Sequence, residues 1–338
     1  MHSITIAVAF AIAVTGCAPP LRPAPLPPIE PANLMSAEDY STRVGGLRAT
    51  LARNGVELDT IPVIRTCATD HGPQDKCIRC EVASRSDTAN VDPEMIDGVA
   101  IAFGMYPTTM IAAAKLEHVA LCRTIRYEGK ESESGPPQGG PLAQGGFGPQ
   151  DADRNRSAGS GPAGVAVIGD HRLLVSIEHF VGKRHDLYDF FTIEEVVHHE
   201  LFHLLDHETL GERAEHDPQW QALNPRGFEY RDPSTAQDRP RGFVDGYATT
   251  NETEDRASVF EFLLGHPTKL CELAQADPVV AAKTAVVWER VARIVGDPFL
   301  HSHAPCVGWL RSSTMLPKQL GPAPPEGPAR RSILGKMR

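Results

Sequence analysis

The chain has no surplus of positive charge. Its 338 residues include 33 lysines and arginines against 43 aspartates and glutamates, which gives a formal net charge of -10 and a pI of ≈ 5.8. Nucleic acids are bound through clustered basic side chains, so this balance argues against a nucleic acid partner. Hydrophobic residues make up 41% of the chain, which is ordinary for a soluble globular protein. The length is ample for one sizeable hydrophobic core.

The N-terminal region lacks an apolar run long enough to span a bilayer. Residues 4–14 are apolar, but a transmembrane helix needs about 20 such residues, and a shorter run is typical of a signal peptide. The run ends at Val14-Thr15-Gly16-Cys17, which resembles a bacterial lipobox. By that resemblance the chain is cut before Cys17, which then carries the lipid. Residues 1–16 are therefore predicted to be a lipoprotein signal peptide.

The first three residues also lack the lysine or arginine that usually opens a signal peptide. Two alternatives therefore stay open: ordinary secretion with cleavage after Ala18, and a cytoplasmic protein with an apolar start. Residues 17–33 are dense in proline, which favours extended polyproline II and predicts a semi-rigid tether. We expect a protein held in the bacterial cell envelope by its lipid. The outer membrane is the expected location, because Ala18 stands where an inner-membrane retention signal usually has aspartate.

The cysteines lack the pattern of a zinc ribbon. Cys77-Ile-Arg-Cys80 is a C-x-x-C motif, but no second pair follows at zinc-ribbon spacing, and no βαβ pattern indicates a redox motif. Of the seven cysteines, six remain when Cys17 is set aside. An even number in an exported protein indicates up to three disulfides. Cys271 with Cys306 is the pair that we expect in the C-terminal part.

Residues 129–164 have almost no large apolar side chains and are dense in Gly, Pro, Ser and Gln. Such a segment cannot bury enough apolar surface to order itself, so it is predicted to be a disordered insertion. The Pro- and Gly-containing tail, residues 317–338, is also predicted to be disordered. The ordered chain is thereby divided into residues 34–128 and 165–316, which we expect to form the N-terminal part and the core of one catalytic domain.

Local patterns predict helices and strands on both sides of the insertion. Before it, the expected elements are helices over 36–53 and 107–121, strands over 61–66 and 122–127, and a disulfide-tied loop over 67–97. After it, they are a hairpin over 165–177 around Gly169-Asp170, a loop or small subdomain over 211–242, and helices over 251–265 and 277–295. An edge strand in the hairpin could pair with an extended peptide, although a purely structural hairpin is the alternative.

The segment Thr192–His207 carries the motif His199-Glu200-Leu201-Phe202-His203, which reads H-E-x-x-H. Residues four apart lie on one face of a helix, so the two imidazoles can point at one metal ion. Glu200 lies about 100° further round the helix, where a general base for an activated water is needed. The alternative is a surface helix that matches the motif by chance. The many apolar residues of the segment favour a buried helix, and Thr192 with Glu195 is a capping box.

The sequence lacks the third histidine of the metzincins. In H-E-x-x-H-x-x-G-x-x-H, the positions of the glycine and the last histidine are occupied here by Asp206 and Thr209. A catalytic zinc nevertheless needs three protein ligands and one open position. The third ligand is therefore expected to be a carboxylate on a later helix.

The histidine motif followed by Tyr247-Ala-Thr-Thr-Asn-Glu-Thr-Glu254 resembles the gluzincin metallopeptidases, and is most similar to the catalytic domain of anthrax lethal factor and its relatives. The resemblance covers about residues 165–265. In that family a Tyr-x-x-Thr-Asn-Glu-x-Glu segment supplies the third zinc ligand with its second Glu, and its Tyr faces the reacting carbonyl. The resemblance implies one Zn²⁺ per chain held by His199, His203 and Glu254, with Glu200 as base and Tyr247 as transition-state donor.

The resemblance also implies an α+β, zincin-like fold with an active-site helix, a small mixed sheet and a following helical lobe. The implied function is a zinc-dependent endopeptidase that acts on a peptide or protein substrate. One position departs from the family, which usually has a carboxylate four residues after the ligand Glu. Here that residue is Ser258, and Asp255 is a possible substitute. A catalytically inactive envelope lipoprotein with a binding role and a zinc amidase acting on the cell wall remain as alternatives.

Overall fold

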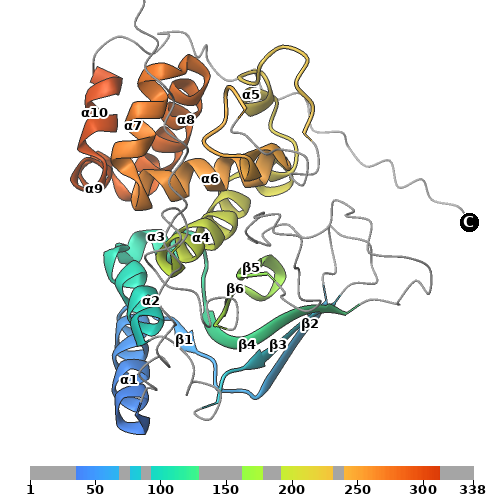
Figure 1. The fold of residues 1–338 in the computed structure, drawn as a ribbon, viewed down its shortest axis with the longest axis vertical. Coiled ribbons are helices and arrows are strands. Elements are labelled where there is room, and N and C mark those ends of the chain that lie inside the picture. Colours follow the sequence, from blue (N-terminus) through green and yellow to red (C-terminus); the bar gives the residue numbers. More distant parts are fainter. Residues whose placement is uncertain are drawn as a thin grey trace, which may run out of the picture. The chain divides into compact units, whose positions relative to one another are not determined.

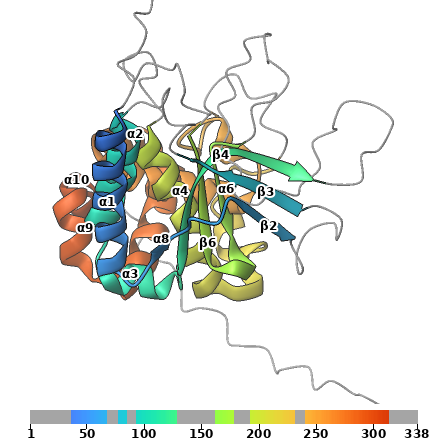
Figure 2. The ribbon, with the colours of Figure 1, turned by 90° about the horizontal axis from the view of Figure 1, so that it is seen from below.

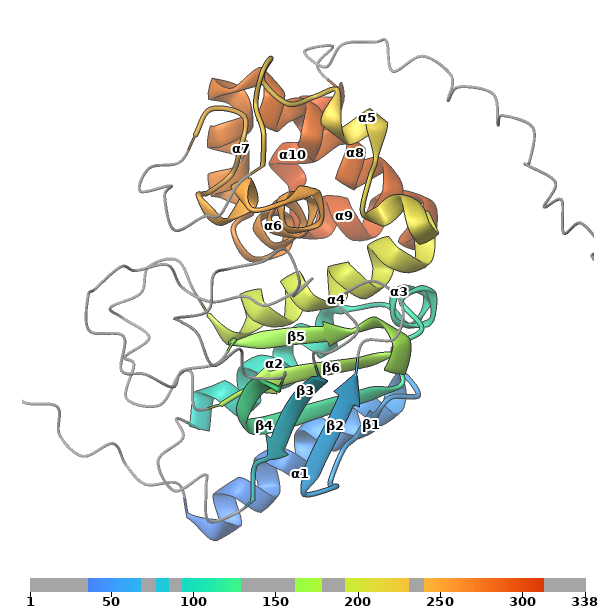
Figure 3. The same ribbon diagram turned by 90° about the vertical axis from the view of Figure 1, so that its right-hand side faces the viewer.

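The fold places helix α4 (Ile193–Leu210) between a β-sheet and a group of helices (Figures 1 and 3). Every described residue belongs to the unit Asn33–Arg338. The computed structural model describes residues 36–67, 77–84, 93–128, 162–177, 192–230 and 240–312. The predicted signal peptide, the tether, most of the insertion (129–161) and the tail (317–338) lie outside these residues.

Three helices precede and flank the sheet. Helix α1 (Ala37–Arg53) begins as predicted at Ser36, whose hydroxyl accepts the backbone N–H of Asp39 at 3.0 Å. It ends at Asn54, before Gly55 with φ +72°. Helices α2 (Pro93–Met105) and α3 (Thr108–Ala113) follow. Figure 2 shows α1 against α2, and α2 in turn packs on α4.

The sheet is small and mixed, as predicted. Strands β1 and β6 run parallel to β4, whereas the β2–β3, β3–β4 and β5–β6 pairs are antiparallel. The order is β2-β3-β4-β6-β5, with β1 also beside β4, so β5 forms an edge within the described sheet. The strands are β1 (Glu57–Leu58), β2 (Val63–Cys67), β3 (Cys77–Val82), β4 (His118–Glu128), β5 (Gly164–Val167) and β6 (Arg172–Ser176).

Two faces of the sheet are buried. Val119 and Leu121 of β4 belong to the large core that includes α4, whereas Ala120 and Cys122 belong to a smaller apolar cluster. This alternation is the period of a strand that is buried on both faces. The large core continues through α4 into the following helices, so that α4 is buried from both sides.

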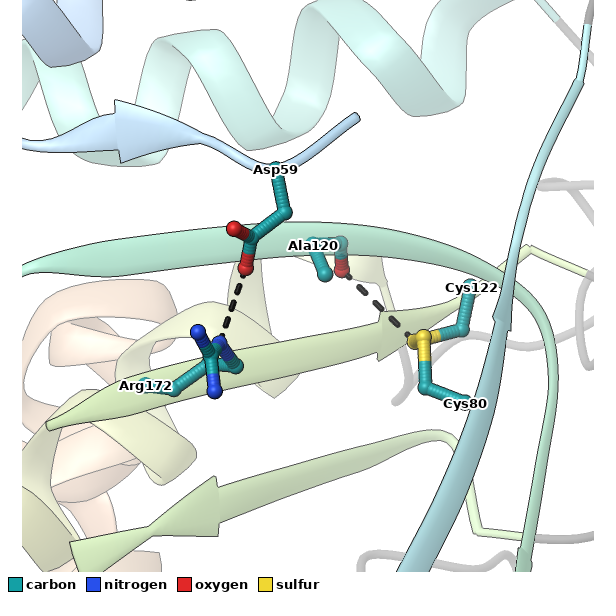
Figure 4. Close-up of a disulfide and its surroundings, with 5 residues drawn as sticks. All are labelled: Asp59, Cys80, Ala120, Cys122 and Arg172. Atoms are coloured by element: carbon teal, nitrogen blue, oxygen red, sulfur yellow. Dashed lines mark hydrogen bonds and ion pairs between the residues drawn. A yellow bond between two sulfur atoms is a disulfide. The ribbon is translucent and has the colours of Figure 1, made fainter. Parts of the chain in front are cut away.

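Disulfides fasten both halves of the fold. Cys80 of β3 bonds Cys122 of β4, close to the ion pair of Asp59 with Arg172, which joins the end of β1 to β6 (Figure 4). Cys77 is also disulfide-bonded and therefore does not bond Cys80, so the C-x-x-C is not a closed redox pair. The predicted bond between Cys271 and Cys306 is confirmed. It joins helices α7 (Pro267–Ala276) and α10 (Pro305–Ser312).

The helical lobe follows α4, which starts at the predicted capping box of Thr192 and Glu195. Asn251 caps the N-terminus of helix α6 (Glu252–Gly265), and Asp277 caps that of helix α8 (Pro278–Val295). Helix α8 ends, as predicted, at Gly296, which has φ +83°. In the described part of the chain, no helix combines the length and apolar character that crossing a membrane requires. The remaining elements are η5 (Gly211–Ala214), α5 (Pro218–Gln221), η7 (Tyr247–Thr249), α6 (Glu252–Gly265), α8 (Pro278–Val295) and α9 (Asp297–His303).

Three predicted segments are wrong in part. The helix expected over 107–121 ends at Ala113, because Lys115 takes φ 50° and the following residues pair with β6. The alanines predict a helix locally, but sheet pairing decides the outcome. The loop expected over 67–97 contains β3 and the start of α2. Order after the insertion begins before residue 165, since Ala163 is buried and β5 starts at Gly164.

Candidate metal centre

The candidate site lies where α4 and α6 pack together as antiparallel helices. Two contacts about one turn apart along α4 define this register. The rings of Phe202 and Phe260 stack with centroids 4.8 Å apart. One turn after the second histidine of the motif, Asp206 accepts a hydrogen bond from Arg256 at 2.7 Å, and both side chains are buried. The face of α6 that carries Glu254 is thereby held against the motif of α4.

The three predicted metal ligands converge in this interface. Oε2 of Glu254 lies 2.8 Å from Nε2 of His199 and 3.4 Å from Nε2 of His203. The candidate ligand atoms all lie within 4.8 Å of one another, and the three residues are buried. The packing of the two helices therefore brings together His203 and Glu254, which are 51 positions apart in the sequence.

The chemistry of this group fits a divalent metal ion. Burial lowers the pKa of His199 to about 4, so its ring is neutral near pH 7 and has only one N–H. Yet both of its nitrogens face carboxylates, those of Glu254 and Glu261. A cation among the three ligand atoms lets Nε2 face the metal while Nδ1 donates to Glu261. Two imidazoles and one carboxylate are a donor set of catalytic zinc sites.

Glu254 stays ionised in this interface. Burial by itself would raise the pKa of its carboxyl, but the contacts with His203 and His199 outweigh burial and hold that pKa well below its usual range. Metal ligands must be deprotonated to bind. The site thus offers one carboxylate and, at His199, an imidazole with an available lone pair, which is the protonation state that a metal ion requires.

Glu200 lies beside this group and is fully buried. Its Oε2 accepts the backbone N–H of Ala166, in strand β5, at 2.8 Å. The strand comes this close because of Gly164, where an added Cβ would lie 2.5 Å from a methyl group of Val196 and 2.7 Å from Cγ of Glu200. The structure therefore puts the predicted base between the candidate ligands and the edge strand.

Tyr247 faces the site from the short helix η7. The centroid of its ring lies 5.8 Å from that of His199. Burial, and next the carboxylates of Glu254 and Glu200, raise the pKa of its phenol well above the usual value, so the hydroxyl keeps its proton. Asp245 holds η7 by accepting the backbone N–H of Ala248 at 2.7 Å. The predicted donor is thus close to the ligands and protonated.

One residue of the site was missed in the sequence. Oε2 of Glu261 lies 3.0 Å from Nδ1 of His199, and both side chains are buried. Glu261 stands seven residues, or two helical turns, after Glu254, so the helical period could have identified it. Within the described residues, the hydroxyl of Ser258 is buried without a hydrogen-bond partner.

Asp255, the possible substitute for a carboxylate at residue 258, belongs to a separate cluster. Its Oδ2 accepts hydrogen bonds from the indole of Trp220, the hydroxyl of Tyr230 and the ammonium of Lys283, at 2.9, 2.9 and 2.6 Å. These partners fasten the segment after α4, and α8, to α6. Asp255 is therefore not the substitute that its sequence position left possible, because its carboxylate is engaged on another face of the helix.

His198 precedes the first ligand in sequence but has a different environment. It hydrogen-bonds the hydroxyl of Tyr106, which is buried in the large core. Burial lowers the pKa of His198 to about 3, so the ring is neutral. Of the three histidines at 198, 199 and 203, only the last two therefore belong to the candidate metal group.

Comparisons with known proteins add little to this geometry. No family model and no curated protein sequence matches the chain. Among solved structures, the chain is similar to a "putative zinc-binding metallo-peptidase" from Bacteroides caccae, with 14% identity and a TM-score of 0.37 over 83% of this chain and 97% of that one. A likeness this distant carries no weight for function, which depends on the residues described above.

Proposed function

We propose that the chain is a zinc-dependent endopeptidase of the gluzincin type, similar in its site to anthrax lethal factor and its relatives. The observation that carries the proposal is the convergence of Glu254 with His199 and His203, beside the buried carboxylate of Glu200. The order of the two sequence motifs supports the same assignment. One zinc per chain would be held by these three ligands.

Each side chain has a distinct task in peptide hydrolysis. His199, His203 and Glu254 would hold the zinc, which would supply a Lewis acid for the scissile carbonyl and for an attacking water near neutral pH. Glu200 accepts the proton of the attacking water and passes it to the nitrogen that leaves when the C–N bond breaks. Tyr247 donates its phenolic hydrogen to the carbonyl oxygen as negative charge develops there.

Strand β5 is the proposed binding edge for an extended peptide. The N–H of Ala166 donates to Glu200. At this residue the backbone N–H and C=O groups of β5 therefore point away from β6. Alternate residues of an antiparallel edge strand turn the same way, so Gly164 shares this orientation. A substrate that pairs along this edge would bring its backbone past Glu200 and the ligands.

The decisive experiment measures zinc content and peptide cleavage on the same purified protein. We expect about one zinc per chain and cleavage of a peptide library, both lost in His203→Ala. Glu200→Gln should keep its zinc and lose cleavage. Full cleavage by Glu200→Gln would remove Glu200 as the base. Stoichiometric zinc without cleavage would favour the inactive binding lipoprotein, and digestion of cell-wall fragments but not casein would favour the amidase.

We also propose that the chain is a lipoprotein of the bacterial outer membrane, anchored through Cys17. The lipobox-like sequence supports the anchor. The disulfides at Cys80–Cys122 and Cys271–Cys306 support an oxidising compartment. The expected partners are then the membrane and a peptide or protein substrate. A nucleic acid partner is not expected. Incorporation of labelled fatty acid that persists in Cys17→Ala would contradict the anchor.

A further inference from the structure

We infer that Glu261 is a positioning residue for the metal ligand His199, a role that nothing in the two sequence motifs assigns to it. The inference rests on the proposed zinc site, because it concerns how one ligand of that site is held. It also explains why this chain can have Ser258 at the position where the gluzincins that it resembles usually have a carboxylate.

The contact has the geometry that such a role requires. Oε2 of Glu261 lies 3.0 Å from Nδ1 of His199, on the side of the ring opposite to Nε2, which faces Glu254 at 2.8 Å. A histidine that binds a metal through one nitrogen donates the N–H of the other to an oxygen, which fixes the tautomer and the orientation of the ring. The carboxylate of Glu261 is that acceptor for His199.

The burial of Glu261 has no other explanation among the described residues. A buried carboxylate is costly unless it is hydrogen-bonded, and the contact with His199 is the only hydrogen bond that the described structure gives to Glu261. Other buried carboxylates nearby have structural partners instead. Glu195 accepts the backbone N–H of Thr192 and pairs with His266, and Glu252 accepts the backbone N–H of Asp217.

The position of Glu261 on α6 explains how it replaces residue 258. Residues 254, 258 and 261 follow one another on one face of the helix, at intervals of four and three. Ser258 is fully buried on this face, but its hydroxyl makes no hydrogen bond within the described chain. The acceptor for the first histidine is thus moved one turn further along α6 and reaches Nδ1 from there.

The test compares zinc affinity in Glu261→Gln and in a matched control, Glu195→Gln. Both variants replace the carboxyl group of a buried glutamate in the α4–α6 region by an amide, but Glu195 contacts no candidate ligand. Zinc affinity is measured by competition with a chromophoric chelator, and stability by thermal unfolding of the same samples. We expect Glu261→Gln to bind zinc about 10–100-fold more weakly than the wild type, and Glu195→Gln to lose stability but keep wild-type zinc affinity.

Two outcomes would overturn the positioning role. One is unchanged zinc affinity in Glu261→Gln. The other is an equal loss of affinity in both variants, which would mark Glu261 as a structural residue only. Failure of the proposed function looks different, because the wild type itself would then bind no zinc, or would bind zinc without cleaving peptides.

A measurement on the wild type keeps the inference testable if Glu261→Gln does not fold. In zinc-loaded protein labelled with ¹⁵N-histidine, the ring of His199 can be assigned through its proximity to the ring of Tyr247. We expect Nδ1 of His199 to carry a proton that exchanges slowly with water. An unprotonated or metal-bound Nδ1 in this ring would contradict the assignment of Glu261.

Discussion

At the scale of residues, the hydroxyl of Tyr247 is the group whose contribution can be removed most cleanly. Tyr247→Phe keeps the ring beside His199 and removes the hydroxyl that is the proposed donor to the oxyanion. Loss of one oxyanion donor in a hydrolase costs about 10²–10³ in kcat. We therefore expect a fall of this order in kcat with KM and zinc content little changed, measured by steady-state cleavage of a peptide and by metal analysis.

Tyr230→Phe is the matched control, because its hydroxyl donates to Asp255 and contacts no ligand. It should lower stability by about 1 kcal/mol, the usual net contribution of a hydrogen bond, and leave kcat near the wild-type value. Equal kcat in wild type and Tyr247→Phe would remove Tyr247 from the reaction.

The residues of the site differ in how far the sequence predicts them. His199, Glu200 and His203 are set by a local helical spacing, which a sequence displays directly. Glu254 and Tyr247 could be proposed only through the resemblance to a family, because 51 residues separate the ligands. Glu261 was missed because its role depends on the register of α4 against α6, which is a property of packing and not of either helix alone.

At the scale of elements, an ion pair joins the start of α4 to the junction of α6 and α7. Glu195 lies in the first turn of α4, and His266 is the residue at which α6 ends and α7 begins. Its hydrogen bond to Glu195 raises the pKa of His266 above the ordinary 6.5, against the opposing effect of burial. The pair thus holds the two site-bearing helices together while His266 is protonated.

The raised pKa predicts how stability depends on pH. A group whose pKa is higher in the folded state contributes its full stabilisation below the unfolded value, 6.5 here, and loses it as the pH rises through the folded pKa. We expect a contribution of about 1 kcal/mol or less, as for other partly exposed pairs. The free energy of unfolding is measured by urea titration at pH 6 and at pH 9. We expect its decrease from pH 6 to pH 9 to be larger in the wild type than in His266→Gln.

Glu195→Gln removes the other partner and should reduce the same pH dependence. If both variants keep the wild-type difference between pH 6 and pH 9, the ion pair is not its source. The capping box that contains Glu195 was predictable, because it lies within one turn of helix. The pairing with His266 was not, since it joins residues 71 positions apart whose side chains meet only when α4 and α6 pack.

At the scale of the whole molecule, the candidate metal centre joins two separately fastened halves. The sheet half holds the Cys80–Cys122 disulfide and packs on α4. The helical lobe holds Cys271–Cys306 and includes α6. Alternating hydrophobicity and helix caps predict much of each half, but helix α2 was missed. The helices α7, α9 and α10 and the strand β3 were also missed, because short elements are defined by their neighbours more than by their own pattern.

Removal of the metal should therefore weaken the molecule as a whole. Two of the candidate ligands come from α4 and one from α6, so zinc that binds only the folded chain would stabilise the packing of the two helices. At free zinc about 100 times the Kd, this linkage amounts to about 2.7 kcal/mol. We expect a chelator to lower the unfolding temperature of the wild type, and added zinc to restore it.

His203→Ala separates this effect from a general response to the chelator. The variant keeps the disulfides and the apolar contacts of α4 but loses a candidate ligand, so its unfolding temperature should not respond to chelator or zinc. A variant that responds as strongly as the wild type would mean that zinc stabilises the fold at another site. A wild type that does not respond would mean that α4 and α6 are held by their apolar contacts and by pairs such as Asp206–Arg256 and Glu195–His266, with no contribution from a metal.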